Sequence, residues 1–120
     1  MLDKLTEFVL KYSTYKDRAV LEARIAKHIE YKTYLVAYDN QGDIAGCCLW
    51  VIDGDTCRIL DCIIKNEYRN NGMMKSMLQR GLAMWPVAKN ISFNRDYNED
   101  GHDRWPEDRT YDIQKMLRRL

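Results

Sequence analysis

The stretch TCRILDCIIKNEYRNNGMMKSMLQRGLAMW, residues 56–85, decides the fold because it predicts a strand, a turn and a helix in direct succession. Residues 56–64 are mostly apolar or small at both alternating positions, which is typical of a central strand covered on two faces. Residues 68–72 predict a turn, since Asn and Gly tolerate a positive φ. The helix that follows ends near Trp85, because Pro86 cannot continue it.

The predicted helix has one apolar face and begins at a candidate anion site. Its apolar or small positions recur at helical spacing and are Met74, Met77, Leu78, Gly81 and Trp85. The first amides of a helix have no intrahelical acceptor, and the helix dipole adds partial positive charge there. Residues 71–74 are therefore a candidate phosphate-binding turn.

Residues 63–74, IIKNEYRNNGMM, resemble the acetyl-CoA-binding motif of the GNAT superfamily of N-acetyltransferases. That motif reads Q/R-x-x-G-x-G/A between a central strand and a helix. Arg69 and Gly72 match its first two fixed positions, whereas Met74 replaces the third, which is normally small. The resemblance implies acetyl-CoA as co-substrate, with its pyrophosphate on the turn and its pantetheine along the strand. The implied cofactor-binding residues are Cys62, Ile63, Ile64, Arg69, Asn70, Asn71, Gly72, Met73 and Met74.

The rest of the chain predicts elements on both sides of this unit. Helices are expected at about 2–13 and 17–30, the second capped by Asp17, and strands at 34–38 and 44–52. A strand at 91–93 follows the crossover helix and is expected parallel to the strand at 56–64. The expected fold class is α/β (α+β), with a mixed sheet of about four strands: an antiparallel meander and one parallel strand, flanked by helices. This order is similar to a minimal GNAT core, without that family's first strand and final hairpin.

Composition predicts one globular domain spanning residues 1–120. Of these residues 46% are hydrophobic and 31% charged, and 19 Lys and Arg oppose 18 acidic residues. No strong net field favours a nucleic acid or a membrane surface as partner. The sequence contains no apolar run of the length needed for export or for a membrane span, so a cytoplasmic protein is expected.

Four cysteines, Cys47, Cys48, Cys57 and Cys62, lie in predicted strands without the C-x-x-C spacing of metal sites. They are expected to be reduced core residues, with Cys47 and Cys48 on opposite faces of the sheet. His28 has no other ligand type at suitable spacing on its predicted helix face, so no metal site and no catalytic role are assigned to it.

Asp61 is the candidate general base. Regular alternation would place it on one strand face with Cys57, Ile59 and Ile63, where partial desolvation raises the pKa of a carboxylate. A structural alternative stays open: the carboxylate accepts hydrogen bonds from a neighbouring loop or pairs with Arg58 or Lys65.

Tyr111 is the candidate acid. Residues 105–108, WPED, predict a helix start, which would place Tyr111 early in a C-terminal helix. The fourth helix of the resembled family often carries a tyrosine that protonates the departing CoA thiolate. The alternative is a tyrosine packed at the edge of the sheet.

Residues 96–107 also satisfy the EF-hand calcium pattern. A predicted strand precedes the loop in place of a helix, and Arg104 puts positive charge at the ninth position. The loop at 94–105 is therefore favoured as a contact surface for a protein partner or a second copy of the chain, over a calcium site.

The sequence predicts a CoA-dependent N-acyltransferase that moves an acyl group, most simply acetyl, to an amine acceptor. The alternative is a catalytically inactive GNAT-like protein used for binding or assembly, as small phage-encoded members are. Three features favour this alternative: Met74, the absent end hairpin, and Arg58 near the position where histone-acetylating members of the resembled family place a glutamate. The strand, turn and helix at 56–85 favour the enzyme.

Overall fold

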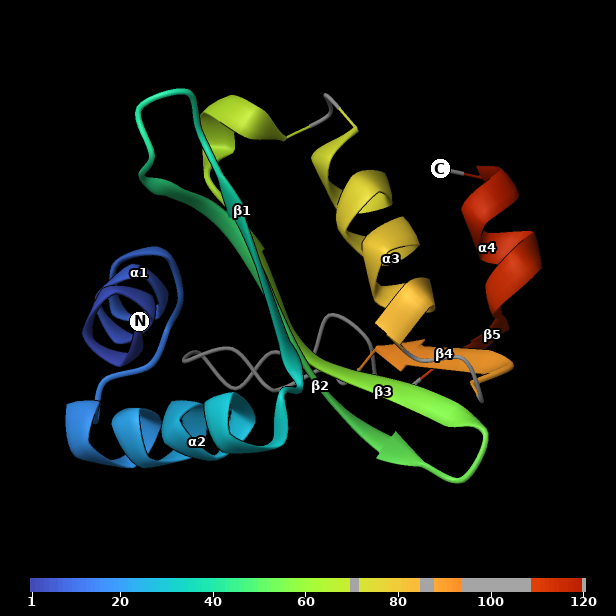
Figure 1. The fold of residues 1–120 in the computed structure, drawn as a ribbon, viewed down its shortest axis with the longest axis horizontal. Coiled ribbons are helices and arrows are strands. Elements are labelled where there is room, and N and C mark those ends of the chain that lie inside the picture. The colour runs from blue at the N-terminus through green and yellow to red at the C-terminus, as the bar shows by residue number, and fades with distance from the viewer. Residues whose placement is uncertain (70–71, 85–87, 94–108, 120) are drawn as a thin grey trace.

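A five-stranded mixed sheet runs through the molecule in the order β1-β2-β3-β4-β5, and helices cover both of its faces (Figure 1). The strands are β1 (Tyr34–Tyr38), β2 (Ile44–Asp53), β3 (Thr56–Ile64), β4 (Asn90–Phe93) and β5 (Arg109–Asp112). The structure is a computed structural model that describes residues 1–69, 72–84, 88–93 and 109–119.

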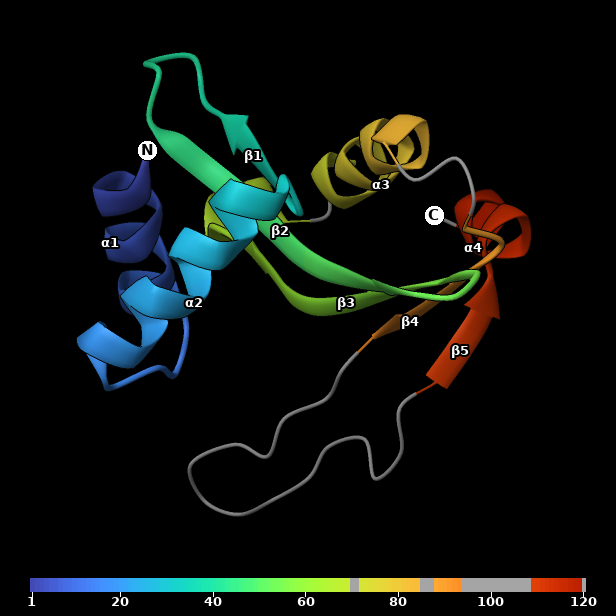
Figure 2. The same ribbon diagram turned by 60° about the horizontal axis from the view of Figure 1, so that its bottom comes forward.

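The helices are divided between the two faces. They are α1 (Leu2–Tyr12), α2 (Arg18–Tyr31), α3 (Met73–Met84) and α4 (Ile113–Arg119), with a short 3₁₀ turn η1 (Asn66–Tyr68) after β3. Figure 2 shows α1 and α2 on one side of the sheet and α3 and α4 on the other. Within the described ranges, no helix combines the length and the apolar character needed to cross a membrane.

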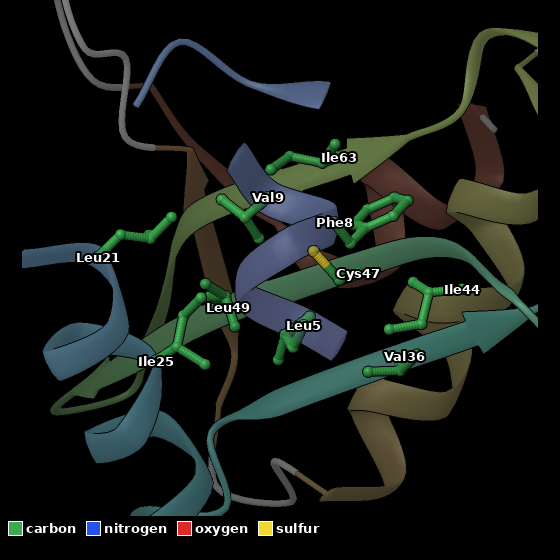
Figure 3. Close-up of a cluster of buried hydrophobic side chains, with 10 residues drawn as sticks. All are labelled: Leu5, Phe8, Val9, Leu21, Ile25, Val36, Ile44, Cys47, Leu49 and Ile63. Carbon is green, nitrogen blue, oxygen red and sulfur yellow. The ribbon is translucent and has the colours of Figure 1, made fainter. Parts of the chain in front are cut away.

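Each face of the sheet has its own hydrophobic core. The core under α1 and α2 consists of Leu5, Phe8, Val9, Leu21, Ile25, Val36, Ile44, Cys47, Leu49 and Ile63 (Figure 3). The core under α3 and α4 consists of Leu35, Cys48, Trp50, Cys57, Ile59, Leu78, Ile91 and Ile113. Cys47 and Cys48 thus lie in different cores, which confirms that neighbouring strand residues point to opposite faces.

The predicted topology is confirmed. β1, β2 and β3 form an antiparallel meander, and β4 pairs parallel to β3 after the α3 crossover. The side chain of Asp17 accepts a hydrogen bond from the Val20 amide at 3.1 Å and caps α2, as expected. The structure adds a fifth strand, because β5 pairs antiparallel with β4.

The C-terminal helix begins later than predicted. Tyr111 was expected early in that helix, but its backbone lies in β5 opposite Ile91. The Asp112 side chain accepts a hydrogen bond from the Lys115 amide at 3.0 Å, which caps α4 and sets its start at Ile113. Residues 105–108, where the helix start was predicted, lie outside the described residues.

A β-bulge at Leu60 changes which face each half of β3 presents. Ile59 is opposite Trp50 and Asp61 is opposite Leu49, so Leu60 is the extra residue between them. The prediction that Asp61 shares a face with Cys57 and Ile59 is therefore wrong. Cys57 and Ile59 belong to the core under α3 and α4, whereas Asp61 points to the α1 and α2 face.

Candidate functional site

The site is built where the parallel strands β3 and β4 part. β3 pairs with β4 over Thr56–Ile59, opposite Asn90–Phe93. Beyond this stretch, residues 61–64 of β3 pair with β2 on one side and with no described strand on the other. The bulge at Leu60 bends the strand at this point. Within the described residues, the far half of β3 therefore presents an open edge to which an extended ligand can hydrogen-bond.

The N-terminus of α3 lies at the same end of the sheet as the end of β3 (Figure 1). Gly72 has φ +87°, a conformation that favours glycine, and its carbonyl accepts the hydrogen bond of the Ser76 amide at 3.0 Å. The earlier amides of Met74 and Lys75 consequently have no acceptor within the helix. Together with the helix dipole, they make this turn suited to a phosphate group.

Arg69 connects the turn before α3 to the end of β3 through hydrogen bonds. Its Nε donates to the Ile64 carbonyl at 3.2 Å, and its backbone amide donates to the Asn66 carbonyl at 3.2 Å. The side chain is exposed, so the guanidinium places positive charge between the end of β3 and the start of α3. Asn70 and Asn71, which the sequence also assigned to the anion site, lie outside the described residues.

The two methionines of the turn point toward the protein. Met74 is partly buried and packs against the core under α3 and α4, as the helical spacing predicts. Met73 lies over β2, since a Cβ added to Gly46 would be 3.2 Å from its Sδ atom. A surface pocket of about 370 Å³ adjoins the turn between α3 and β1. Met74 therefore packs into the core beneath the helix end, and the turn has open space beside it.

Asp61 is held by residues that sequence analysis did not identify. The Tyr15 hydroxyl lies 3.1 Å from Oδ2 and 3.3 Å from Oδ1 of Asp61. Arg24 donates from Nη1 to the Tyr15 oxygen at 2.8 Å, and its guanidinium carbon lies 5.3 Å from the centre of the Tyr15 ring. Arg24, Tyr15 and Asp61 thus form a hydrogen-bonded chain from α2 through the α1–α2 loop to β3. A hydrogen bond from a neighbouring loop was the structural alternative for Asp61, and it is present.

The sequence contained little signal for this chain of residues. Tyr15 follows the end of α1 in a polar segment, and Arg24 lies on a helix with many charged positions. Only the tertiary contact between this segment and β3 shows that Tyr15 contacts Asp61 and that Arg24 in turn contacts Tyr15.

The cysteines form a second group on β2 and β3, and none of the four is in a disulfide. Cys48 and Cys62 are directly opposite each other, and both contact the core under α3 and α4. The hydrogen bond from the Cys48 thiol lowers the pKa of Cys62 and raises that of Cys48. Burial raises the pKa of Cys57 to about 12, so that thiol stays protonated near neutral pH.

A metal centre is not seen in the described part of the chain, where no three His, Cys, Asp or Glu side chains gather closely enough to hold an ion. The EF-hand-like loop at 96–107 lies outside the described residues. Tyr111 is described by its backbone in β5, at the edge strand of the sheet.

Several solved structures share this fold. The E. coli GNAT N-acetyltransferase YhbS in complex with CoA matches with a TM-score of 0.63 at 14% identity, over 97% of this chain and 78% of that one. A GNAT acetyltransferase of Staphylococcus aureus Mu50 matches with a TM-score of 0.63 at 15% identity, over 78% and 66%. The GNAT-like decarboxylase GphF in complex with isobutyryl-CoA matches with a TM-score of 0.61 at 16% identity, over 82% and 63%.

Comparisons at the level of sequence agree with the fold. A search of curated proteins finds no significant match. The sequence profile of the acetyltransferase (GNAT) family, however, matches residues 3–90, which include both helices of the first face, the meander and α3. The chain belongs to the GNAT acetyltransferase family.

Proposed function

We propose that this protein transfers an acyl group, most simply acetyl, from acetyl-CoA to an amine. The observation that carries the proposal is that the open edge of β3, residues 61–64, ends at the same end of the sheet as the start of α3 (Figure 1), and that Arg69 between them is hydrogen-bonded to the Ile64 carbonyl. One ligand that has both an extended amide arm and a pyrophosphate fits both features. Solved structures of the same fold contain CoA or isobutyryl-CoA, which supports this ligand class.

In this proposal the pyrophosphate binds the amides at Gly72–Met74, with the Arg69 guanidinium beside it, and Asn70 and Asn71 belong to the same turn. The pantetheine arm hydrogen-bonds to the backbone of Cys62–Ile64 as an added strand would. The thioester then lies near Leu60, where β3 bends. Backbone amides at this bend polarise the thioester carbonyl and stabilise the oxyanion that forms on attack.

Asp61 is proposed as the general base that binds the protonated amine and accepts its proton. An alkyl amine with a pKa of about 10.4 is mostly an ammonium ion near neutral pH and must lose a proton before it attacks. The carboxylate attracts the ammonium ion, and it accepts the proton directly or through a water. Tyr15 holds the carboxylate in place through the hydrogen bonds at 3.1 and 3.3 Å.

The attack forms a bond between the amine nitrogen and the thioester carbon, and the C–S bond of the tetrahedral intermediate then breaks. The CoA thiolate leaves and takes a proton. Tyr111 is the proposed donor, at the edge of the sheet in β5 in place of the helix expected from sequence.

A titration with acetyl-CoA followed by an amine panel tests the proposal. CoA at a hundredfold excess over its Kd is expected to raise the free energy of unfolding by about 2.7 kcal/mol, which thermal unfolding detects. Release of the CoA thiol that depends on an added amine would establish transfer. Binding of acetyl-CoA without amine-dependent thiol release would favour a non-catalytic member of the family. No binding at millimolar concentration would overturn the proposal.

A further inference from the structure

The geometry of Cys48 and Cys62 is compatible with a disulfide. The Lys65 amide donates to the Ala45 carbonyl at 2.9 Å, so residues 45 and 65 are a hydrogen-bonded pair of the β2–β3 ladder. Bonded and non-bonded pairs alternate along an antiparallel ladder. Cys48 and Cys62, three steps along, are therefore a non-hydrogen-bonded pair with Cα atoms about 4.5 Å apart. Disulfides span Cα distances of about 4.4–6.8 Å.

The two thiols are not equivalent. Cys48 is 1% exposed, whereas Cys62 is partly exposed. The thiol of Cys48 donates the hydrogen bond between them, which lowers the pKa of Cys62 and raises that of Cys48. The more exposed of the two cysteines is thus also the one whose thiol has the lowered pKa. This is the arrangement of a reacting thiol backed by a resolving thiol.

Cys62 also lies on the half of β3 that has its open edge. It is two residues beyond the bulge at Leu60, and its side chain contacts the core under α3, the helix whose first turn forms the anion site. A CoA molecule bound as proposed above carries its sulfur to this part of the strand. The neighbouring Cys57, by contrast, is fully buried where β3 and β4 are paired.

We propose that Cys62 is a thiol–disulfide exchange site for CoA disulfide, with Cys48 as the resolving thiol. The choice of reagent rests on the proposed function, because the anion-binding turn and the open edge of β3 are what would direct a CoA-containing disulfide to Cys62.

The exchange has two balanced steps. The Cys62 thiolate attacks one sulfur of CoA disulfide, so a bond between Cys62 and one CoA sulfur forms while the S–S bond of the reagent breaks. The released CoA thiolate takes up the proton that Cys62 lost. The Cys48 thiolate then attacks the Cys62 sulfur and expels the second CoA thiolate, which is protonated in turn. The two cysteines are oxidised to one disulfide, and one CoA disulfide is reduced to two molecules of CoA.

Mass spectrometry of the intact, reduced protein tests this reaction. Treatment with CoA disulfide is expected to remove two hydrogens from the protein and to release two CoA molecules. A Cys48→Ser variant lacks the resolving thiol and should instead accumulate an adduct of one CoA on Cys62, located by peptide mapping. A Cys62→Ser variant should give neither product. Cys57→Ser is the matched control on the same strand, and it should react like the native protein.

Glutathione disulfide has no CoA portion, so it distinguishes a reaction that CoA binding directs to Cys62 from the general reactivity of this thiol. CoA disulfide is expected to react with Cys62 at least about tenfold faster than glutathione disulfide, since a bound reagent is held beside the thiol. Excess CoA should slow the reaction of CoA disulfide by competing for the same site. Equal rates for the two reagents, or modification only after unfolding, would overturn the inference. A separate CoA titration decides the proposed function: if CoA binds and the rates are equal, the inference alone fails. If CoA does not bind, the proposed function fails as well.

Discussion

The hydroxyl of Tyr15 lies within hydrogen-bonding distance of both carboxylate oxygens of Asp61, at 3.1 and 3.3 Å, although the two residues are 46 positions apart. Arg24 completes the chain by donating to the same hydroxyl at 2.8 Å. The α1–α2 loop and β3 are therefore joined by a polar contact at the point where β3 leaves its parallel partner. This contact fixes the direction of the only acidic side chain that β3 carries.

Asp61→Asn is expected to lower kcat by about 10²-fold or more, because an amide does not accept the proton of the amine. The KM for acetyl-CoA should change little, since Asp61 points to the α1 and α2 face, whereas the proposed phosphate site is at the start of α3 on the other face. Steady-state kinetics with a reactive amine measures both values. An unchanged kcat would show that Asp61 is not the general base.

Tyr15→Phe tests whether Tyr15 acts through Asp61. We expect kcat to fall by about tenfold, with a smaller effect or none in the Asp61→Asn background, because the two changes interrupt one contact. A double-mutant cycle in kcat measures this coupling. Strictly additive losses would show that Tyr15 acts by another route. Thermal unfolding of each variant separates a kinetic effect from loss of the fold.

Gly72→Ala should abolish CoA binding while the domain remains folded. The φ of +87° makes alanine strained by about 1–2 kcal/mol, and a new Cβ would occupy the approach of the phosphate to the helix amides. Gly54→Ala is a matched control, because Gly54 also has a positive φ, +61°, with no atom within 4 Å of an added Cβ. It lies in the β2–β3 turn, and it should lose stability but keep CoA affinity, measured by calorimetry. Equal CoA affinity in both variants would show that the phosphate groups of CoA do not bind at Gly72.

Met74→Ala is expected to lower the free energy of unfolding by about 2 kcal/mol, the low end for a truncated core methionine, because the side chain is only partly buried. CoA affinity should stay the same, since Met74 packs under the helix. Met84 on the same helix is 46% exposed, and Met84→Ala should be nearly neutral. Denaturant unfolding and a CoA titration give the two values. A gain in CoA affinity on shortening Met74 would instead identify this methionine as a plug over the site.

Acid is expected to destabilise the fold through His28. Burial, and next the nearby Arg24, lower the pKa of His28 from its usual value near 6.5, and its Nδ1 contacts the Thr33 hydroxyl at 2.7 Å. The unfolded state therefore binds a proton at a higher pH than the folded state does. The stability that neutral His28 contributes is complete above the unfolded pKa and is lost as pH falls through the folded pKa. Thermal unfolding from pH 7 to pH 5 should show a smaller decrease for His28→Gln, and parallel curves for both proteins would contradict this assignment.

Patterns within single elements predicted most of the fold. The apolar run of β3, the turn at Gly72 and the stripe of Met77 and Leu78 each follow from local periodicity, and the structure has them where they were expected. The capping of α2 by Asp17 was likewise predicted from the sequence, because a capping side chain binds an amide only three residues away.

The features that were not predicted depend on contacts between distant parts of the chain. Strict alternation along β3 cannot register an extra residue, so it placed Asp61 on the wrong face. β5 is stabilised by pairing with β4, which local propensity does not record, and Asp112 rather than Pro106 sets the start of the described helix α4. Tyr15 entered the candidate site only when the α1–α2 loop was seen against the sheet.

Because Leu60 is an extra residue, odd-numbered residues of β3 face opposite sides of the sheet before and after it. Ahead of it the odd-numbered residues Cys57 and Ile59 face α3, whereas beyond it odd-numbered Ile63 faces α1. If Leu60 stayed and the bulge were flattened, one half of the strand would have to exchange its two faces: either Asp61 would enter the apolar side, or Cys57 and Ile59 would leave their core. Deleting Leu60 would instead make Ile59 and Asp61 neighbours that already lie on opposite faces, so both cores would keep their residues and only the bend would be lost. The extra residue therefore changes the path of the strand without changing which side chains either core contains.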